Sequence, residues 1–159
     1  MSSKTLCAWV RLAVVAVAVC GLILCGYVLP SWGAAIVRGT PEVASWYLPW
    51  LLFLWAAALP CFAILWLVWK VAGAIQRETV FTLRTARWIK SAAGCLFADV
   101  GFFFAGNVIF VLMGRSHPGI LLLSLFGDIL GVALAILAAV LSRYITKAAV
   151  LQEESEGTI

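Results

Sequence analysis

Hydrophobic residues occupy four long stretches of the chain, and most charged residues lie in the segments between them. The stretches that hold at most one charged residue cover approximately residues 10–30, 47–69, 91–113 and 120–142. Each is about as long as the roughly 20 residues that an α-helix needs to cross the hydrocarbon core of a bilayer. They lack the alternation of apolar and polar residues that marks barrel strands, so they predict four transmembrane helices.

The composition leads to the same class of protein. Of the 159 residues, 65% are hydrophobic and 11% are charged, and the mean hydropathy is +1.10. A soluble domain has about 25% charged residues. We therefore predict a single all-α integral membrane domain over residues 1–159, with four transmembrane helices in an antiparallel bundle. The first apolar run is longer than the apolar region of a cleaved signal peptide, about 7–15 residues, so we expect it to remain as a helix.

The distribution of lysine and arginine predicts the orientation. With the N-terminus in the cytoplasm, the inner segments carry nine basic residues, namely Lys4, Arg11, Lys70, Arg77, Arg84, Arg87, Lys90, Arg143 and Lys147. The outer segments carry two, Arg38 and Arg115. Because basic residues accumulate on the cytoplasmic side of short loops, both termini are predicted to face the cytoplasm. Residues 70–90 then form a cytoplasmic loop and residues 143–159 a cytoplasmic tail.

The two outer segments differ in predicted structure. The first, about Ser31 to Trp46, contains Gly33, Gly39 and Pro41, residues that favour turns. The second covers residues 114–119 and is short enough to make the last two spans a helical hairpin.

The inner loop contains the start of the third helix. Thr82 is a good N-cap, because its hydroxyl can accept a hydrogen bond from a backbone N–H two or three residues later, so we expect a helix from about Leu83. The predicted contact residues of this loop are Phe81, Thr82, Arg84, Arg87 and Lys90. Its basic side chains are suited either to anionic lipid headgroups or to an acidic protein partner.

The tail ends in an acidic segment. Anionic lipid should repel Glu154 and its acidic neighbours, so the terminal Thr158 and Ile159 with their free carboxylate are held off the membrane. Such a terminus is either a docking peptide for a protein partner or a frayed end.

Three polar residues interrupt the apolar runs of spans three and four. An aspartate at the centre of a span costs about 2.5–3.5 kcal/mol, so Asp99 and Asp128 should face the interior of the protein or a cavity. At about 1.5 Å per residue, Asn107 and Asp128 are at similar depths, which predicts a hydrogen bond between them. The three residues either bind a proton, a cation or an amine, or join helices as hydrogen-bonded glue.

Span four also carries a stripe of small residues. Gly127, Gly131 and Ala135 recur every fourth residue, which lets another helix backbone approach closely. That helix belongs either to this chain, the reading we favour, or to a second protomer in a homo-oligomer.

Several classes of function lack support in the sequence. There is no phosphate-binding glycine loop, no metal-ligand spacing, no nucleophile motif and no DNA-binding motif. No acid, base and nucleophile converge at one depth, so we expect neither an enzyme nor a cofactor, and no direct contact with nucleic acid.

Two segments resemble bacterial membrane proteins of "domain of unknown function 2975". The inner loop reads Ile75-Gln76-Arg77-Glu78-Thr79-Val80-Phe81-Thr82, like that family's Ile-x-(Lys/Arg)-x-x-x-Phe-(Ser/Thr), with Thr85 where an Asn is usual. The terminus reads Glu154-Ser155-Glu156-Gly157-Thr158-Ile159, like Glu-Asn-x-Leu-Thr-Ile, and departs from it at Ser155 and Gly157. The resemblance implies a four-span protein of the bacterial plasma membrane. Family members are often encoded beside a small Cro/CI-like regulator, which suggests such a regulator as a cytoplasmic partner.

Two hypotheses for function follow. The first is a membrane-embedded regulator or sensor that contacts a cytoplasmic partner through its inner loop and tail. The second is a small transporter, channel or tolerance protein that uses Asp99, Asn107 and Asp128 within the bilayer.

Overall fold

The structure is a computed structural model that describes residues 3–77, 79–116 and 118–156. The described chain is helical apart from short turns, with elements α1 (Ser3–Ile23), η1 (Leu24–Val28), α2 (Leu29–Gly39), η2 (Pro41–Val43), α3 (Ala44–Gln76), α4 (Leu83–Leu112) and α5 (Pro118–Glu156). Four stretches are long and apolar enough to cross a membrane, namely Ser3–Gly39, Pro41–Gln76, Leu83–Leu112 and Gly119–Ser155. The predictions of an all-α fold and of four spans are confirmed.

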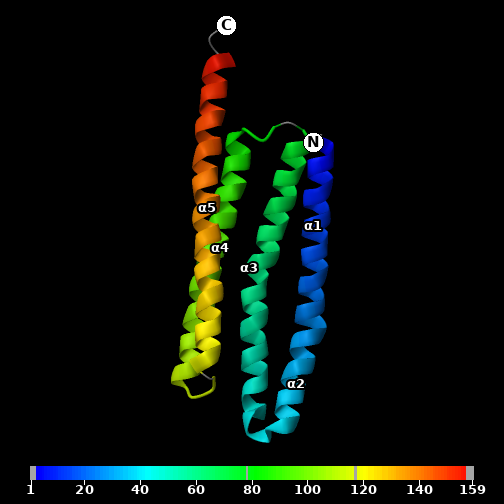
Figure 1. Ribbon diagram of the computed structural model, residues 1–159, viewed down its shortest axis with the longest axis vertical. Helices are drawn as coiled ribbons and strands as arrows, with labels where there is room; N and C mark the ends of the chain where they lie inside the picture. Colours follow the sequence, from blue (N-terminus) through cyan, green and yellow to red (C-terminus); the bar gives the residue numbers. More distant parts are fainter. Residues whose placement is uncertain (1–2, 78, 117, 157–159) are drawn as a thin grey trace.

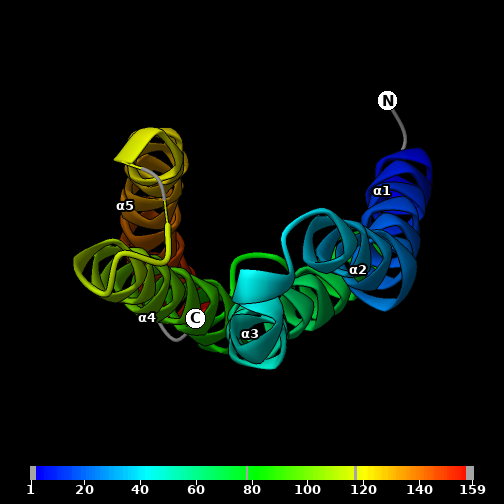
Figure 2. The same ribbon diagram turned by 90° about the horizontal axis from the view of Figure 1, so that it is seen from below.

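The four long stretches lie side by side along the long axis of the molecule (Figure 1). α1 packs on α3, α3 packs on α4, and α4 packs on α5, while no contact joins α1 to α4 or α5 within the described residues. Seen from one end, the helices form a curved row with a concave side between α1–α2 and α5 (Figure 2). The arrangement is therefore an open row, in which the first and last spans do not meet.

The first outer connection is shorter than the sequence suggested. Helix continues from α1 through η1 and α2 as far as Gly39, and the turn is limited to Thr40 and the short η2. The expectation of turns from about Ser31 to Trp46 is therefore wrong for most of that segment. Pro30 lies in the first turn of α2, a position where a missing N–H is tolerated. Gly33 is helical and buried, because its lack of a side chain makes room for the Tyr47 ring of α3.

The π-helical turn η1 precedes Pro30 and contains a carbonyl that Pro30 leaves without its helical donor. The Leu29 N–H donates to the Leu24 carbonyl, five residues earlier, so the matching donor for the Cys25 carbonyl would be residue 30. Pro30 has no N–H. The indole N–H of Trp55 donates to the Cys25 carbonyl instead, at 3.0 Å, and thereby joins α3 to η1 inside the membrane region.

Small residues bring α5 close to α4. Gly131 lies against Val100, where a methyl carbon in place of its hydrogen would come within 2.6 Å of Val100 Cγ2. Ala135 is fully buried one turn later, whereas a methyl carbon added at Gly127 would have no described atom of another element within 4 Å. Further along, the Ser142 hydroxyl donates to the Ala86 carbonyl at 2.8 Å. Two of the three small residues predicted for helix packing thus lie in buried or close-packed positions of this chain.

The inner loop is short and ordered by threonines. α3 continues to Gln76 and α4 begins at Leu83, with Thr82 as its N-cap accepting from the Thr85 N–H at 3.3 Å. The predicted helix start is confirmed. The Thr85 side chain is 1% exposed, and its hydroxyl donates to the Thr79 carbonyl. These bonds fix the direction in which α4 leaves the loop.

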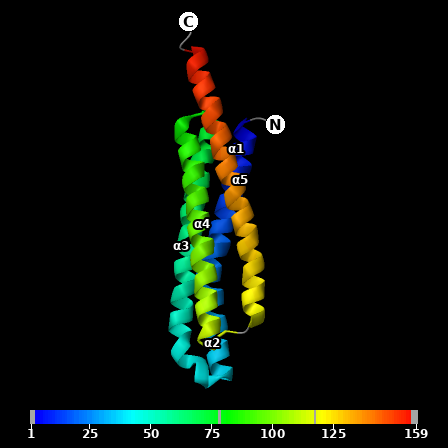
Figure 3. The same cartoon turned by 90° about the vertical axis from the view of Figure 1, so that its left-hand side faces the viewer.

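The last helix is longer than a membrane is thick. α5 contains 39 residues, about 58 Å at 1.5 Å per residue, against a hydrocarbon core of about 30 Å. Its C-terminal part extends beyond the ends of the other helices (Figure 3). We call residues 143–156 of α5 the helical arm, in whose first half Ile145 and Ala149 are still buried.

Candidate functional site

The concave side of the row contains a cavity that reaches both intramembrane aspartates. Its volume is about 470 Å³, and residues of α1, η1, α2, α3, α4 and α5 line it. Most of these residues are apolar, and the charged ones are Asp99 of α4 and Asp128 of α5. We call this space the acidic cavity.

The two carboxyl groups are incompletely hydrogen-bonded. Asp99 Oδ2 accepts a hydrogen bond from the Cys61 thiol of α3, with an S–O distance of 3.4 Å. Asp99 Oδ1 and Asp128 Oδ2 are buried atoms without a hydrogen-bond partner among the described residues. Asp128 as a whole is only 7% exposed. Buried polar atoms are nearly always paired, so each of these oxygens is an acceptor available to a ligand or to water.

Asn107 does not bond to Asp128, and the predicted hydrogen bond between them is wrong. Its amide nitrogen donates to the Phe103 carbonyl of its own helix at 2.8 Å. Because Gly131 lies against Val100 and α5 runs back along α4 (Figure 1), Asp128 is level with Phe103. Asn107 is therefore about one helical turn, or roughly 6 Å, nearer the α4–α5 turn than Asp128. The depth estimate failed because α5 begins at Pro118, earlier than the predicted span.

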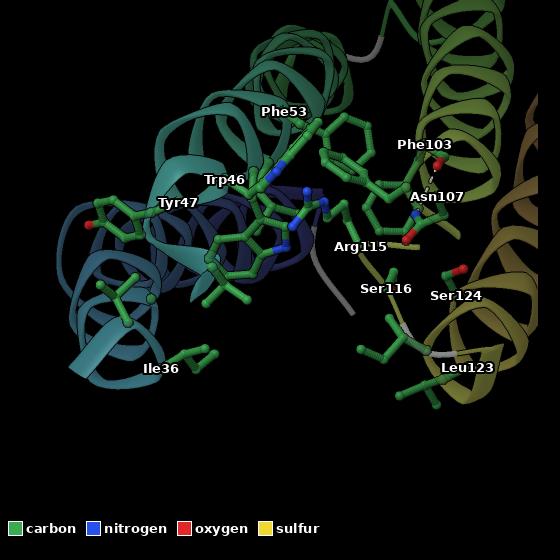
Figure 4. Close-up of a pocket in the computed structure, with 18 residues that line it drawn as sticks. Ile36, Trp46, Tyr47, Phe53, Phe103, Asn107, Arg115, Ser116, Leu123 and Ser124 are labelled. Atoms are coloured by element: carbon green, nitrogen blue, oxygen red, sulfur yellow. Dashed lines mark hydrogen bonds between the residues drawn. The ribbon is translucent and has the colours of Figure 1, made fainter. Parts of the chain in front are cut away.

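A second cavity adjoins the acidic cavity on the side of η2 and the α4–α5 turn. It has a volume of about 640 Å³ and shares Leu54, Phe103 and Gly127 with the acidic cavity. Its walls include six aromatic residues, namely Trp46, Tyr47, Trp50, Phe53, Phe103 and Phe110. We call this space the aromatic chamber. Figure 4 shows Asn107 and Ser124 on one side of it and Trp46 on the other.

The residues predicted for contacts in the cytoplasm lie apart from both cavities. Phe81, Arg84, Arg87 and Lys90 are exposed around the start of α4, and Thr82 is occupied as its N-cap. Arg87 and Lys90 also line a small cavity of about 280 Å³ between α4 and α5. Glu154 is exposed on the helical arm. Thr158 and Ile159 lie outside the described residues.

Sequence reasoning missed Cys61 and the aromatic chamber. Cys61 lies in a span without charge, so only its position opposite Asp99 after folding distinguishes it from the other cysteines. Tryptophan and tyrosine residues near span ends, such as Trp46, Tyr47 and Trp50, are commonly interfacial anchors. Their spacing along the second span gives no sign that they surround one space with residues of α4 and α5.

The arrangement is suited to binding. The described residues contain no group of three His, Cys, Asp or Glu side chains that could hold a metal ion. The acidic cavity combines acceptor oxygens with apolar walls, and its volume lies within the range of small-molecule sites, about 300–1,000 Å³. Such a space fits a molecule that carries one or two N–H donors on an apolar body.

Comparisons with known proteins agree with the membrane class. An uncharacterised membrane protein of Bacillus subtilis (strain 168), YoaS, is 25% identical over 155 residues, which is 95% of this chain and 96% of that protein. No solved structure gives a significant match. The family model described as "Protein of unknown function (DUF2975)" matches residues 32–159, which include α3, α4, α5 and the inner loop. The chain therefore belongs to the DUF2975 family of proteins of unknown function.

Proposed function

We propose that this protein is a membrane-embedded sensor whose acidic cavity binds a cationic amphiphile, meaning an amine attached to an apolar body. The observation that carries the proposal is that Asp99 and Asp128 line the same cavity and that each has a buried carboxylate oxygen without a partner among the described residues. Intramembrane carboxylates are costly, and they mark binding sites and ion pathways more often than passive structure.

The chemistry of the cavity favours an amine over a metal or an anion. A protonated primary amine has three N–H donors and no acceptor, which complements two carboxylates that lack donors of their own. The pairing of an ammonium with a carboxylate is strengthened where water is scarce. The remaining walls, such as Phe62 and Leu65 of α3, offer apolar surface to a hydrocarbon body.

The proposed topology connects the cavity to the cytoplasm. The excess of lysine and arginine in the inner segments supports an antiparallel arrangement with both termini inside the cell. α5 carries Asp128 within its membrane-spanning part and the helical arm at its C-terminal end. A ligand that draws Asp128 toward Asp99 would tilt α5, and the tilt would displace Glu154 and the rest of the arm relative to the inner loop.

Binding is tested by thermal unfolding of the protein in a neutral maltoside detergent, with dodecylamine as the probe and dodecanol as the uncharged analogue. We expect dodecylamine to raise the melting temperature well above the effect of dodecanol. Asp99→Asn and Asp128→Asn keep the shape of the side chains and should each weaken amine binding about tenfold or more. Glu42→Gln, in the outer turn, removes a carboxylate outside the cavity and is the matched control.

Any of three results would exclude the proposed amine site. Equal stabilisation by amine and alcohol, or equal losses in Glu42→Gln and the two aspartate variants, would exclude the proposed site. Retained amine binding in the double variant Asp99→Asn, Asp128→Asn would do the same.

Transport is the second candidate, because the cavity that holds both aspartates is lined by all four spans. In this case the carboxylates carry an amine or a cation across the bilayer. Uptake of radiolabelled amine into proteoliposomes separates the two functions, since a sensor binds without flux. Flux that the double aspartate variant abolishes would favour the transporter.

The cytoplasmic output of the sensor is proposed to be a protein partner, such as a small Cro/CI-like regulator, with no direct contact between the membrane protein and nucleic acid. The support is the helical arm, whose first half lies beside the exposed basic start of α4 and whose end extends beyond the other helices (Figure 3). Co-purification of the full chain and of a chain that ends at Leu151 tests it. If both chains co-purify with identical sets of cytosolic proteins, residues 152–159 do not bind the partner.

A further inference from the structure

The turn between α4 and α5 fixes an arginine at the rim of the aromatic chamber. Gly114 adopts a left-handed conformation, with φ of 65°, just after the end of α4. The Gly114 N–H donates to the Val111 carbonyl at 2.9 Å and the Arg115 N–H to the Phe110 carbonyl at 2.8 Å. This pair of bonds is a Schellman motif, which turns the chain back over the end of the helix. The backbone of Arg115 is therefore held in one position rather than free in a loop.

The side chain of Arg115 is held as well. Its guanidinium carbon lies 4.9 Å from the centre of the Trp46 ring, and the ring packs edge-on against Phe110, with centroids 6.5 Å apart. Figure 4 shows the arginine extending alongside the Trp46 indole. A guanidinium on an aromatic face keeps its N–H groups at its edge for other acceptors. No hydrogen bond of these groups to a carboxylate occurs among the described residues.

The chamber below Arg115 is apolar and aromatic, and it lies at the end of the spans. Among the described residues that line it, Arg115 is the one with a charged side chain. Tyr47 donates its phenol hydroxyl to the Pro30 carbonyl, and Asn107 uses its amide on Phe103, so these polar groups are already partly occupied. The space therefore has a positive rim at the level of the α4–α5 turn and an apolar interior.

We propose that the aromatic chamber is a phospholipid site, in which Arg115 binds the phosphodiester and an acyl chain enters the space between Trp50, Phe53 and Ile120. The guanidinium fork matches two phosphate oxygens, as a lysine would not. The height of the site suits this ligand, because the turn that carries Arg115 lies where headgroups lie and the chamber lies where chains lie. The proposal goes beyond the sensor function and does not depend on it, since Asp99 and Asp128 take no part.

The aromatic walls explain why a chain would prefer this space to the open bilayer. Phe53 stacks on Phe103 with centroids 5.6 Å apart and meets Phe110 edge-on at 5.4 Å, so the rings form one rigid wall. A rigid wall is already ordered before the chain binds, which reduces the entropy lost on binding. A lipid that is held in this way becomes part of the outer end of the protein.

The test measures thermal unfolding in a neutral maltoside detergent with three probes: a single-chain phosphatidylglycerol, a monoacylglycerol with the same chain, and inorganic phosphate. We expect the phospholipid to stabilise the protein at a concentration about tenfold lower than the monoacylglycerol, and phosphate alone to have no effect. Arg115→Gln should remove the preference for the phospholipid, and Arg115→Lys should retain part of it.

Arg38→Gln is the matched control. Arg38 is the other basic residue of the outer segments, it is exposed, and its Nε donates to the Ala34 carbonyl of its own helix at 3.3 Å. We expect it to leave the preference unchanged. Equal stabilisation by phospholipid and monoacylglycerol would overturn the proposal, and so would equal losses in Arg38→Gln and Arg115→Gln. Stabilisation by inorganic phosphate to the same extent would show a free-anion site instead of a lipid site.

Discussion

The acidic cavity and the aromatic chamber share part of their walls but differ in chemistry. Leu54, Phe103 and Gly127 line both. On one side of them, the two carboxyl groups have buried oxygens without partners in the described part of the chain. On the other side, toward the α4–α5 turn, an arginine lies on an indole ring at the rim. The first space offers hydrogen-bond acceptors in the middle of the spans, and the second offers donors near their ends. The curved row of helices therefore has a groove whose charge changes sign along its length.

The difference shows how the position of a charge along a span determines its role. Arg115 lies at the end of the spans, where a cation is inexpensive, and it keeps its N–H groups available while it packs on Trp46. Asp128 is 7% exposed near the level of Phe103, away from the ends of the spans, and lines the acidic cavity. A charge at the end of a span can reach headgroups, whereas a buried carboxylate oxygen without a partner among the described residues calls for a ligand inside the protein.

The largest expected effect is that of Gly106→Ala, which displaces the Phe53 ring that lines the aromatic chamber. A methyl group at Gly106 would collide with the Phe53 ring, which is wedged among Phe102, Phe103 and Phe110. Overpacking of this kind costs about 1–3 kcal/mol of unfolding free energy. We expect a lower melting temperature in detergent and loss of the phospholipid preference, while amine binding in the acidic cavity is retained.

Gly101→Ala is the control for this change. It lies on the same helix, and nothing is within 4 Å of the added carbon, so neither stability nor ligand binding should fall. Equal losses of stability and of phospholipid preference in both variants would mean that the glycines act through the flexibility of the α4 backbone and not through the contact of Gly106 with Phe53.

The next effect concerns the acidic cavity. Gly131→Ala places a methyl carbon 2.6 Å from Val100 Cγ2, and both residues line this cavity. Valine has few rotamers in a helix, so α5 must move away from α4, at a cost of about 1 kcal/mol or more. Amine binding should weaken because the movement separates Asp128 from Asp99, and phospholipid binding should change less. A variant that loses the phospholipid preference but keeps amine binding would contradict the division into two sites.

The sequence predicted the elements better than their relative placement. Four apolar runs were sufficient for four spans, and the hydroxyl of Thr82 was sufficient for the start of α4, because these features depend on neighbours in the chain. The segment from Ser31 to Gly39 was misjudged, since Gly33 makes room for the Tyr47 ring within a helix and the preceding Pro30 is accommodated in the first turn of α2. Such compensation comes from tertiary contacts that periodicity does not show.

The same limit applies to the candidate site. Asp99 and Asp128 were identified from the cost of an acid in hydrocarbon, which is a property of each residue alone. Their grouping with Cys61, and the separation of Asn107 from Asp128, depend on the register of α4 against α5 and of α3 against α4. A shift of one turn changes such pairs, and helix ends read from a sequence are uncertain by about that much.

A smaller effect than that of the glycines is expected from a change of charge at the rim. Arg115→Glu removes the guanidinium from an exposed turn, so the melting temperature of the protein without ligand should change little. The preference among single-chain lipids should move away from phosphatidylglycerol, because the rim now repels its phosphate. Binding of dodecylamine at Asp99 and Asp128 should remain. A large fall in stability without ligand would mean that the stacking on Trp46 supports the fold rather than a site.

The smallest effect is expected at Asn107, and it tests where the boundary between the two spaces lies. Its amide donates to the Phe103 carbonyl of its own helix, and its side chain is 8% exposed on the wall of the aromatic chamber. Asn107→Leu preserves the approximate volume of the side chain and removes one hydrogen bond within the helix, so the free energy of unfolding should change by about 1 kcal/mol. If Asn107 only lines the chamber and does not bind the amine, the affinity for dodecylamine should change by less than about twofold. Asp128→Asn, one turn deeper, is measured beside it. Each variant changes one polar side chain, and the two positions lie at neighbouring depths. Similar losses of amine affinity in both variants would mean that Asn107 binds the amine together with the two aspartates, and that the acidic cavity and the aromatic chamber form one binding site.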